Sequence, residues 1–91
     1  MPDLMKVGGV TGWLRVAAQA EAASIPMSSH LFAEASAHML AVTPTAHWLE
    51  LLDLGRAILA EPVKIVDGAI TARGHGLGIQ WNETAVAKYL V

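Results

Sequence analysis

The sequence repeats one local pattern, in which a short apolar run is followed by a junction of glycine or polar residues and then by a helical pattern. The strand-like runs are Leu4–Val7, Ile25–Ser28 and Ala46–Leu49, and the helical patterns between them cover 11–23 and 32–42. Strands about 20 residues apart with one helix between them are typical of right-handed βαβ units. The repeat therefore predicts an α/β fold with a parallel sheet or barrel.

Residues 61–91 follow a different pattern. Val63–Val66 and Ala69–Ala72 flank Asp67–Gly68, a dipeptide that is typical of a two-residue β-hairpin. After a glycine-rich loop, Asn82 is positioned to cap a helix that extends to about Leu90. Because a hairpin does not extend a parallel barrel, we assign residues 1–60 to barrel strands and helices and residues 61–91 to a tail that packs on another domain.

The composition narrows the class of protein. Apolar residues make up 54% of the chain and charged residues only 15%, which suggests faces that are buried against other protein. No apolar run reaches the roughly 18 residues of a membrane span, and the six Lys and Arg residues are not clustered. We therefore expect no membrane or nucleic-acid partner. Without a long apolar segment near the start, we expect a cytoplasmic protein.

Three polar residues lie near the ends of the strand-like runs: Asp3, His30 and Glu50. Neighbouring parallel strands would bring them to one face, where Asp3 could accept the Nδ1 proton of His30 and leave Nε2 as a general base. Glu50 could then act as a second acid. The alternative is a structural histidine with two solvated carboxylates. Asp3 also precedes the Leu4–Val7 run, so it reaches this face only if its strand begins earlier.

The other histidines and the glycine-rich loop point less clearly to chemistry. His38 lies in a helical pattern and His47 in a strand-like run, and their spacing does not match a metal site. Residues 74–78 alternate glycine with other residues, but they neither follow a long strand nor open a helix, so a glycine turn is favoured over a dinucleotide loop.

Several runs resemble the C-terminal portion of the mandelate racemase/muconate lactonizing enzyme group of the enolase superfamily. They are Pro2–Trp13, Ile25–Phe32, Thr43–Glu50, Gly76–Trp81 and Lys88–Val91. The resemblance covers nearly the whole chain and implies the last βα units of a modified (β/α) TIM barrel, with a tail that returns to an N-terminal capping domain. Since such a barrel needs on the order of 250 residues, we expect this chain by itself to be inactive.

The resemblance also implies roles for the three polar residues. Asp3 matches the aspartate of a His-Asp dyad, His30 the base that removes the proton α to a carboxylate, and Glu50 an acid that binds the substrate carboxylate. Leu31 and Leu52 are candidate apolar contacts for a 2-hydroxy acid substrate. The implied cofactor is Mg²⁺, whose ligands, like the lysine base of the opposite face, are expected upstream. We therefore predict no metal ligand in this chain. For the full-length protein we expect a homo-oligomer.

Two other functions stay open. An acid-sugar dehydratase of the same superfamily uses a similar dyad to form the same kind of intermediate, and Glu50 favours the racemase over it. The second alternative is a non-catalytic piece that docks on a complementary barrel fragment.

Overall fold

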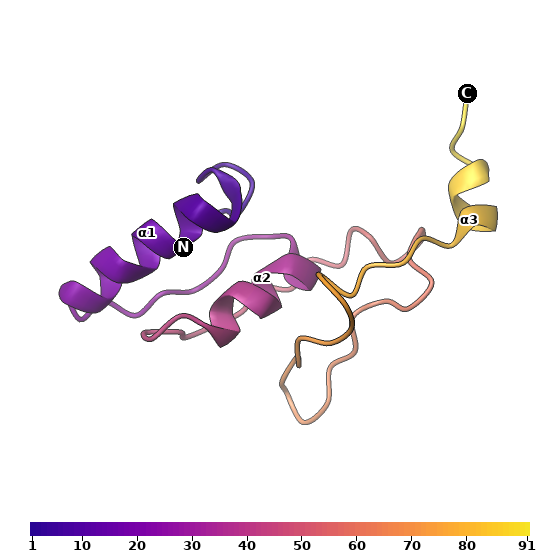
Figure 1. Ribbon diagram of the computed structural model, residues 1–91. Helices are drawn as coiled ribbons and strands as arrows, with labels where there is room; N and C mark the ends of the chain where they lie inside the picture. The colour runs from indigo at the N-terminus through magenta and orange to yellow at the C-terminus, as the bar shows by residue number, and fades with distance from the viewer.

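A computed structural model describes all residues, 1–91, and contains three helices. They are α1 (Gly9–Ala22), α2 (Ala33–Ala41) and α3 (Glu83–Ala87). Helices α1 and α2 occupy one part of an elongated molecule, and α3 lies apart at the opposite end, with a long irregular segment between them (Figure 1). None of the helices is both long and apolar enough to cross a membrane.

Extended segments lie beside one another next to α1 and α2, but they are joined by single bridges rather than by continuous ladders. Asp3 pairs with His30 and Met27 pairs with Ala46, and both bridges are parallel. Backbone hydrogen bonds continue this register, since the Ser29 amide donates to the carbonyl of Trp48 at 2.9 Å. The segment around 25–30 therefore lies between the other two, as the repeated pattern predicts.

The predicted strand at Leu4–Val7 is wrong, because residues 4–8 form a turn. The cause is Asp3, whose Oδ1 accepts the amides of Met5 at 2.9 Å and Lys6 at 3.1 Å and so bends the backbone directly after the bridge to His30. Asp3 consequently ends the first extended segment instead of preceding it. This placement removes the objection that Asp3 stands on the wrong side of its strand.

Helix α1 starts earlier than predicted, at a glycine rather than at Thr11. Gly8 precedes the helix with φ 97°, a left-handed conformation that favours glycine. Gly12 lies so close to the preceding turn that a Cβ there would be 1.8 Å from the carbonyl oxygen of Val7. Glycine at both positions lets the chain pass from the Asp3 turn directly into the helix.

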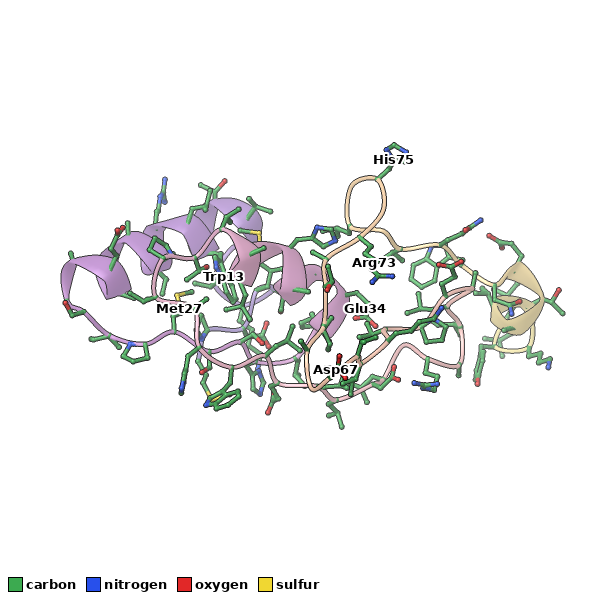
Figure 2. The ribbon with its side chains drawn as sticks, turned by 90° about the horizontal axis from the view of Figure 1, so that it is seen from below. Trp13, Met27, Glu34, Asp67, Arg73 and His75 are labelled. Carbon is green, nitrogen blue, oxygen red and sulfur yellow. The ribbon has the colours of Figure 1, made fainter.

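The core lies between α1, α2 and the middle extended segment. Its buried apolar residues are Leu4, Trp13, Ala17, Met27, Ala35 and Met39. Trp13 and Met27 lie within the part of the molecule that α1 and α2 form (Figure 2). Trp13 is fully buried, and its indole N–H donates to Thr43 Oγ1 at 2.9 Å, so the polar edge of the ring is satisfied.

The predicted buried stripe of α2 is confirmed at Ala35 and Met39 but not at Val42. Val42 is 61% exposed because the helix ends at Ala41, so the next residue leaves the helical face. Helix α2 also begins at Ala33 rather than at Phe32, whose φ of 47° is left-handed.

In the tail, the predicted turn at Asp67–Gly68 is confirmed. Val66 and Ala69 exchange two backbone hydrogen bonds of 2.9 and 3.0 Å, and the two residues between them have positive φ, as a type I′ turn requires. The flanking runs form only this one bridge. Asn82 caps α3 by accepting the Ala85 amide at 3.0 Å, and the helix ends at Ala87, short of the predicted Leu90.

Candidate functional site

The site is built on the parallel bridge between Asp3 and His30. The carboxylate of Asp3 is buried, and its Oδ2 lies 3.1 Å from His30 Nδ1, while the His30 side chain is 39% exposed. An ionised carboxylate only accepts hydrogen bonds, so a neutral His30 carries its proton on Nδ1 and leaves Nε2 free as an acceptor. The pair therefore presents an oriented, basic nitrogen to the surroundings.

The environment of Asp3 keeps this carboxylate ionised. Burial alone would raise the pKa of Asp3, but hydrogen bonds from the Lys6 amide, the His30 ring and the Met5 amide stabilise the charged form. These bonds, with the charge of Lys6, hold the pKa below the ordinary value of 3.8. Asp3 thus remains a hydrogen-bond acceptor for His30 over the whole neutral range.

Glu50 lies on the other side of His30. The distance between Glu50 Oε2 and His30 Nε2 is 3.9 Å, which is too long for a hydrogen bond. The same oxygen accepts a hydrogen bond from the Leu31 amide at 2.9 Å. The backbone amide of Glu50 donates to Ser29 Oγ at 3.1 Å. The structure therefore brings Asp3, His30 and Glu50 together in the predicted order, with His30 between the two carboxylates.

An apolar pocket of about 280 Å³ adjoins the backbone that follows His30. The two leucines predicted to contact substrate, Leu31 and Leu52, both line it, together with Trp81 from the tail. A separate open hollow is lined by Asp3, Lys6 and His30 among others. His30 therefore lines the open hollow, and Leu31, the next residue in the chain, lines the apolar pocket.

The remaining histidines make ordinary contacts. Nε2 of His38 lies 3.0 Å from the carbonyl oxygen of Leu77, and this contact joins α2 to the glycine-rich loop. His75 projects from the tip of that loop (Figure 2). His47 Nδ1 lies 3.5 Å from Ser28 Oγ, and its ring is tilted against Trp48. None of the three joins the cluster around His30.

The residues of this chain do not fit a magnesium ion. Magnesium takes oxygen ligands in a near-octahedral shell, and the structure contains no group of three or more His, Cys, Asp or Glu side chains that could hold a metal. Oε2 of Glu50 and both oxygens of Asp3 are already engaged within the chain. We therefore assign no step to a metal held here.

Sequence reasoning missed two buried hydroxyl groups beside the site. Ser29 and Ser36 are both fully buried, and they hydrogen-bond to Glu50 and Leu31 respectively. The paired serines before His30 were a visible polar signal, but Ser36 lies in an alanine-rich helical pattern where nothing in the sequence marks it.

The chain matches the family described as enolase C-terminal domain-like over residues 1–85. It belongs to this family. In its structure it is similar to an enolase from Bradyrhizobium complexed with magnesium and mandelic acid, with 70% identity and a TM-score of 0.97. That match covers 100% of this chain and 25% of the enolase. Magnesium is also bound in other solved relatives, as the resemblance implied.

Two curated relatives carry out different reactions. A 3,6-anhydro-alpha-L-galactonate cycloisomerase from Streptomyces coelicolor is 36% identical over 84% of this chain and 22% of its own length. A D-gluconate dehydratase from Thermoproteus tenax is 35% identical over 97% of this chain and 20% of its own length. The chain thus spans about a quarter or less of the relatives it matches.

Proposed function

We propose that this chain provides the His30–Asp3 dyad and the Glu50 acid of a mandelate-racemase-like isomerase acting on 2-hydroxy acids. The observation that carries the proposal is the 3.1 Å contact between His30 Nδ1 and the buried carboxylate of Asp3. In a neutral imidazole this contact places the proton on Nδ1 and leaves Nε2 as the acceptor. The mandelic acid bound by the 70% identical enolase supports this substrate class. In this proposal the substrate is a small carboxylate with an α-hydroxyl group.

In the proposed step, His30 Nε2 takes the proton from the α-carbon. The electron pair of the C–H bond moves into the adjoining carboxylate as an enediolate forms, and His30 becomes an imidazolium that Asp3 stabilises. Inversion then requires a proton donor on the opposite face of the substrate. We assign that second group to another part of the whole protein, as the resemblance implies.

Glu50 is proposed to stabilise the charge that develops on the substrate carboxylate. Its Oε2 is occupied by the Leu31 amide, and no protein group donates a hydrogen bond to Oε1. A carboxyl group donates a hydrogen bond only when it is protonated, so Oε1 is the atom that would carry the proton toward the substrate. Such a bond strengthens as negative charge accumulates, which is the condition for catalysis.

We further propose that residues 1–60 form the last strands and helices of a (β/α) barrel and that residues 61–91 pack on a capping domain. The parallel bridges of Asp3 and Met27 support the first part. The second part is supported by a helix α3 without any buried residue and by exposed apolar side chains next to the hairpin turn, at Ile65 and Val66, and on either side of α3, at Trp81 and Tyr89.

The test is a chimera in which this chain replaces the matching quarter of the Bradyrhizobium enolase. With Mg²⁺ and one enantiomer of mandelate in D₂O, we expect loss of optical rotation and incorporation of deuterium at the α-carbon. His30→Asn should abolish both for the enantiomer whose proton faces His30. The unaltered enolase is the positive control, and the isolated 91-residue chain should show neither signal.

A folded chimera that exchanges no α-proton, beside an active parent enolase, would contradict the proposed base. An isolated chain that racemises mandelate in a His30-dependent manner would instead contradict the expected inactivity of the chain alone.

The second candidate, an acid-sugar dehydratase, is favoured by the similarity to the D-gluconate dehydratase. The same proton abstraction would then be followed by expulsion of a β-hydroxyl as water, which gives a 2-keto-3-deoxy acid. A chimera that produces semicarbazide-reactive keto acid from gluconate, without racemising mandelate, would replace the isomerase by the dehydratase.

A further inference from the structure

Ser36 makes an unusual hydrogen bond for a serine within a helix. Its side chain is fully buried in α2, and Oγ donates to the carbonyl oxygen of Leu31 at 2.8 Å. A serine inside a helix ordinarily bonds the carbonyl three or four residues earlier. Ser36 reaches five residues back, past the start of the helix, to the residue that directly follows His30.

The bond reaches that far because the backbone between His30 and α2 is left-handed. Leu31 and Phe32 have φ of 55° and 47°, two consecutive non-glycine residues in a sparsely populated conformation. Such a turn persists only where the surrounding structure holds it. The hydroxyl of Ser36 holds this turn by its hydrogen bond to the Leu31 carbonyl.

The amide side of the same turn faces Glu50. The Leu31 N–H donates to Glu50 Oε2 at 2.9 Å, and the Glu50 amide donates to Ser29 Oγ at 3.1 Å. Glu50 is therefore held by the two residues that flank His30. Its backbone amide is bonded to Ser29, and its carboxylate is bonded to Leu31. Any rotation of Leu31 would move the amide that fixes this carboxylate.

We propose that Ser36 is a positioning residue that acts through the Leu31 turn to fix the Glu50 carboxylate beside His30. The proposal rests on the proposed function of Glu50 as the acid of the site. In this arrangement the buried hydroxyl holds Leu31 left-handed, and the Leu31 amide then keeps Oε2 engaged and leaves Oε1 without a hydrogen-bond partner in the chain.

The experiment measures the Leu31 amide of the full 91-residue chain by NMR in a double-mutant cycle, at a concentration at which light scattering gives the mass of the monomer. In the absence of substrate, Glu50→Gln replaces the carboxyl oxygen that accepts the Leu31 amide by a weaker amide acceptor and should shift the Leu31 amide proton of the wild type upfield. In a Ser36→Ala background the same substitution should shift it by less than half as much. Amide exchange at Leu31 should also become at least tenfold faster in Ser36→Ala.

Thr43→Val is the matched control. Thr43 is also a buried hydroxyl of the α2 region. Its Oγ1 donates to the Met39 carbonyl at 2.7 Å and accepts the Trp13 indole N–H at 2.9 Å, and it makes no hydrogen bond to Glu50 or Leu31. This control should leave the effect of Glu50→Gln on Leu31 unchanged. If Ser36→Ala does not fold, Ser36→Cys, which keeps the volume and weakens the donor, is used in its place.

An equal effect of Glu50→Gln with and without Ser36 would overturn the proposal, as would a wild-type Leu31 amide that does not respond to Glu50→Gln at all. A reduced effect in Thr43→Val as well would show a general loss of structure and would also overturn it. Because this measurement needs no turnover, its failure is distinct from failure of the chimera to exchange the α-proton.

Discussion

At the scale of residues, one carboxylate organises both the backbone and the base. Oδ1 of Asp3 accepts two amides of the following turn, while Oδ2 faces His30 Nδ1. The hydrogen bonds from the two amides fix the orientation of the carboxylate toward the imidazole. Orientation of His30 therefore depends on local contacts within residues 3–6 as much as on the pair itself.

We expect Asp3→Asn to disturb this arrangement although the side chains have nearly the same shape. An asparagine that keeps its oxygen toward the turn presents an amide N–H₂ to His30 Nδ1, so two donors meet and the imidazole proton moves to Nε2. Loss of the charged acceptor of the His30 ring should lower the free energy of unfolding by more than the control substitution below does. Urea denaturation and ¹⁵N NMR of His30 measure the two effects.

Asp67→Asn is the control for that substitution. Asp67 is exposed in the hairpin turn with φ 51°, a conformation that asparagine tolerates, so its effect should stay within about 0.5 kcal/mol. Equal effects of the two substitutions would contradict a special role of Asp3.

The lowered pKa of Asp3 also predicts how stability changes with pH. Because the pKa is lower in the folded chain than the ordinary 3.8, the folded state favours the ionised form. The contribution of Asp3 to stability is then complete above pH 3.8 and is lost as the pH falls through the lower folded-state pKa. The difference in unfolding free energy between wild type and Asp3→Asn should narrow in acid, and a constant difference would contradict this.

At the scale of elements, the entry into α1 depends on close backbone approach. A Cβ on Gly12 would lie 1.8 Å from the Val7 carbonyl oxygen, so the turn that carries Asp3 could not lead into the helix without moving. The geometry of the Asp3 turn and the position of Trp13 in the core are therefore linked through one glycine.

Gly12→Ala should accordingly lower the free energy of unfolding by at least about 2 kcal/mol, despite the higher helix propensity of alanine. Thermal denaturation followed by circular dichroism measures the loss. Gly76→Ala is the comparison, since its φ of 58° is left-handed but no atom lies within 4 Å of an added Cβ. We expect about 1 kcal/mol there, and a smaller loss at Gly12 than at Gly76 would refute the steric argument.

At the scale of the whole molecule, the core is small for the apolar content of the chain. Only 13 of 91 residues are buried, and many large apolar side chains are exposed. Those more than two-thirds exposed include Trp48, Leu54, Tyr89 and Leu90. Apolar surface of this kind is ordinarily covered by other protein.

The isolated chain should therefore self-associate. Size-exclusion chromatography with light scattering should give a mass above 9.6 kDa that rises with concentration, and the chain should bind a hydrophobic dye such as ANS. A monomer at every concentration that binds no dye would show that these side chains are covered in another way. It would also favour a self-sufficient docking module over an incomplete barrel.

The sequence alone determined the features that depend on local pattern. Helical periodicity predicted α1 and α2 to within a few residues, the Asp67–Gly68 dipeptide predicted the turn, and strand spacing placed Asp3, His30 and Glu50 as neighbours. Each of these follows from residue type and separation along the chain.

Tertiary structure decided what local pattern could not. Leu4–Val7 has a strand-like composition, but the bridge between Asp3 and His30, which are distant in sequence, ends the extended segment at Asp3, and the Asp3 side chain then holds the turn that follows. Leu31 and Phe32 adopt a left-handed conformation that their residue types disfavour, because Glu50 and Ser36 hold Leu31 from segments distant in sequence or across the start of a helix. Hydrogen bonds between such segments arise only when the chain has folded, so the sequence does not reveal them.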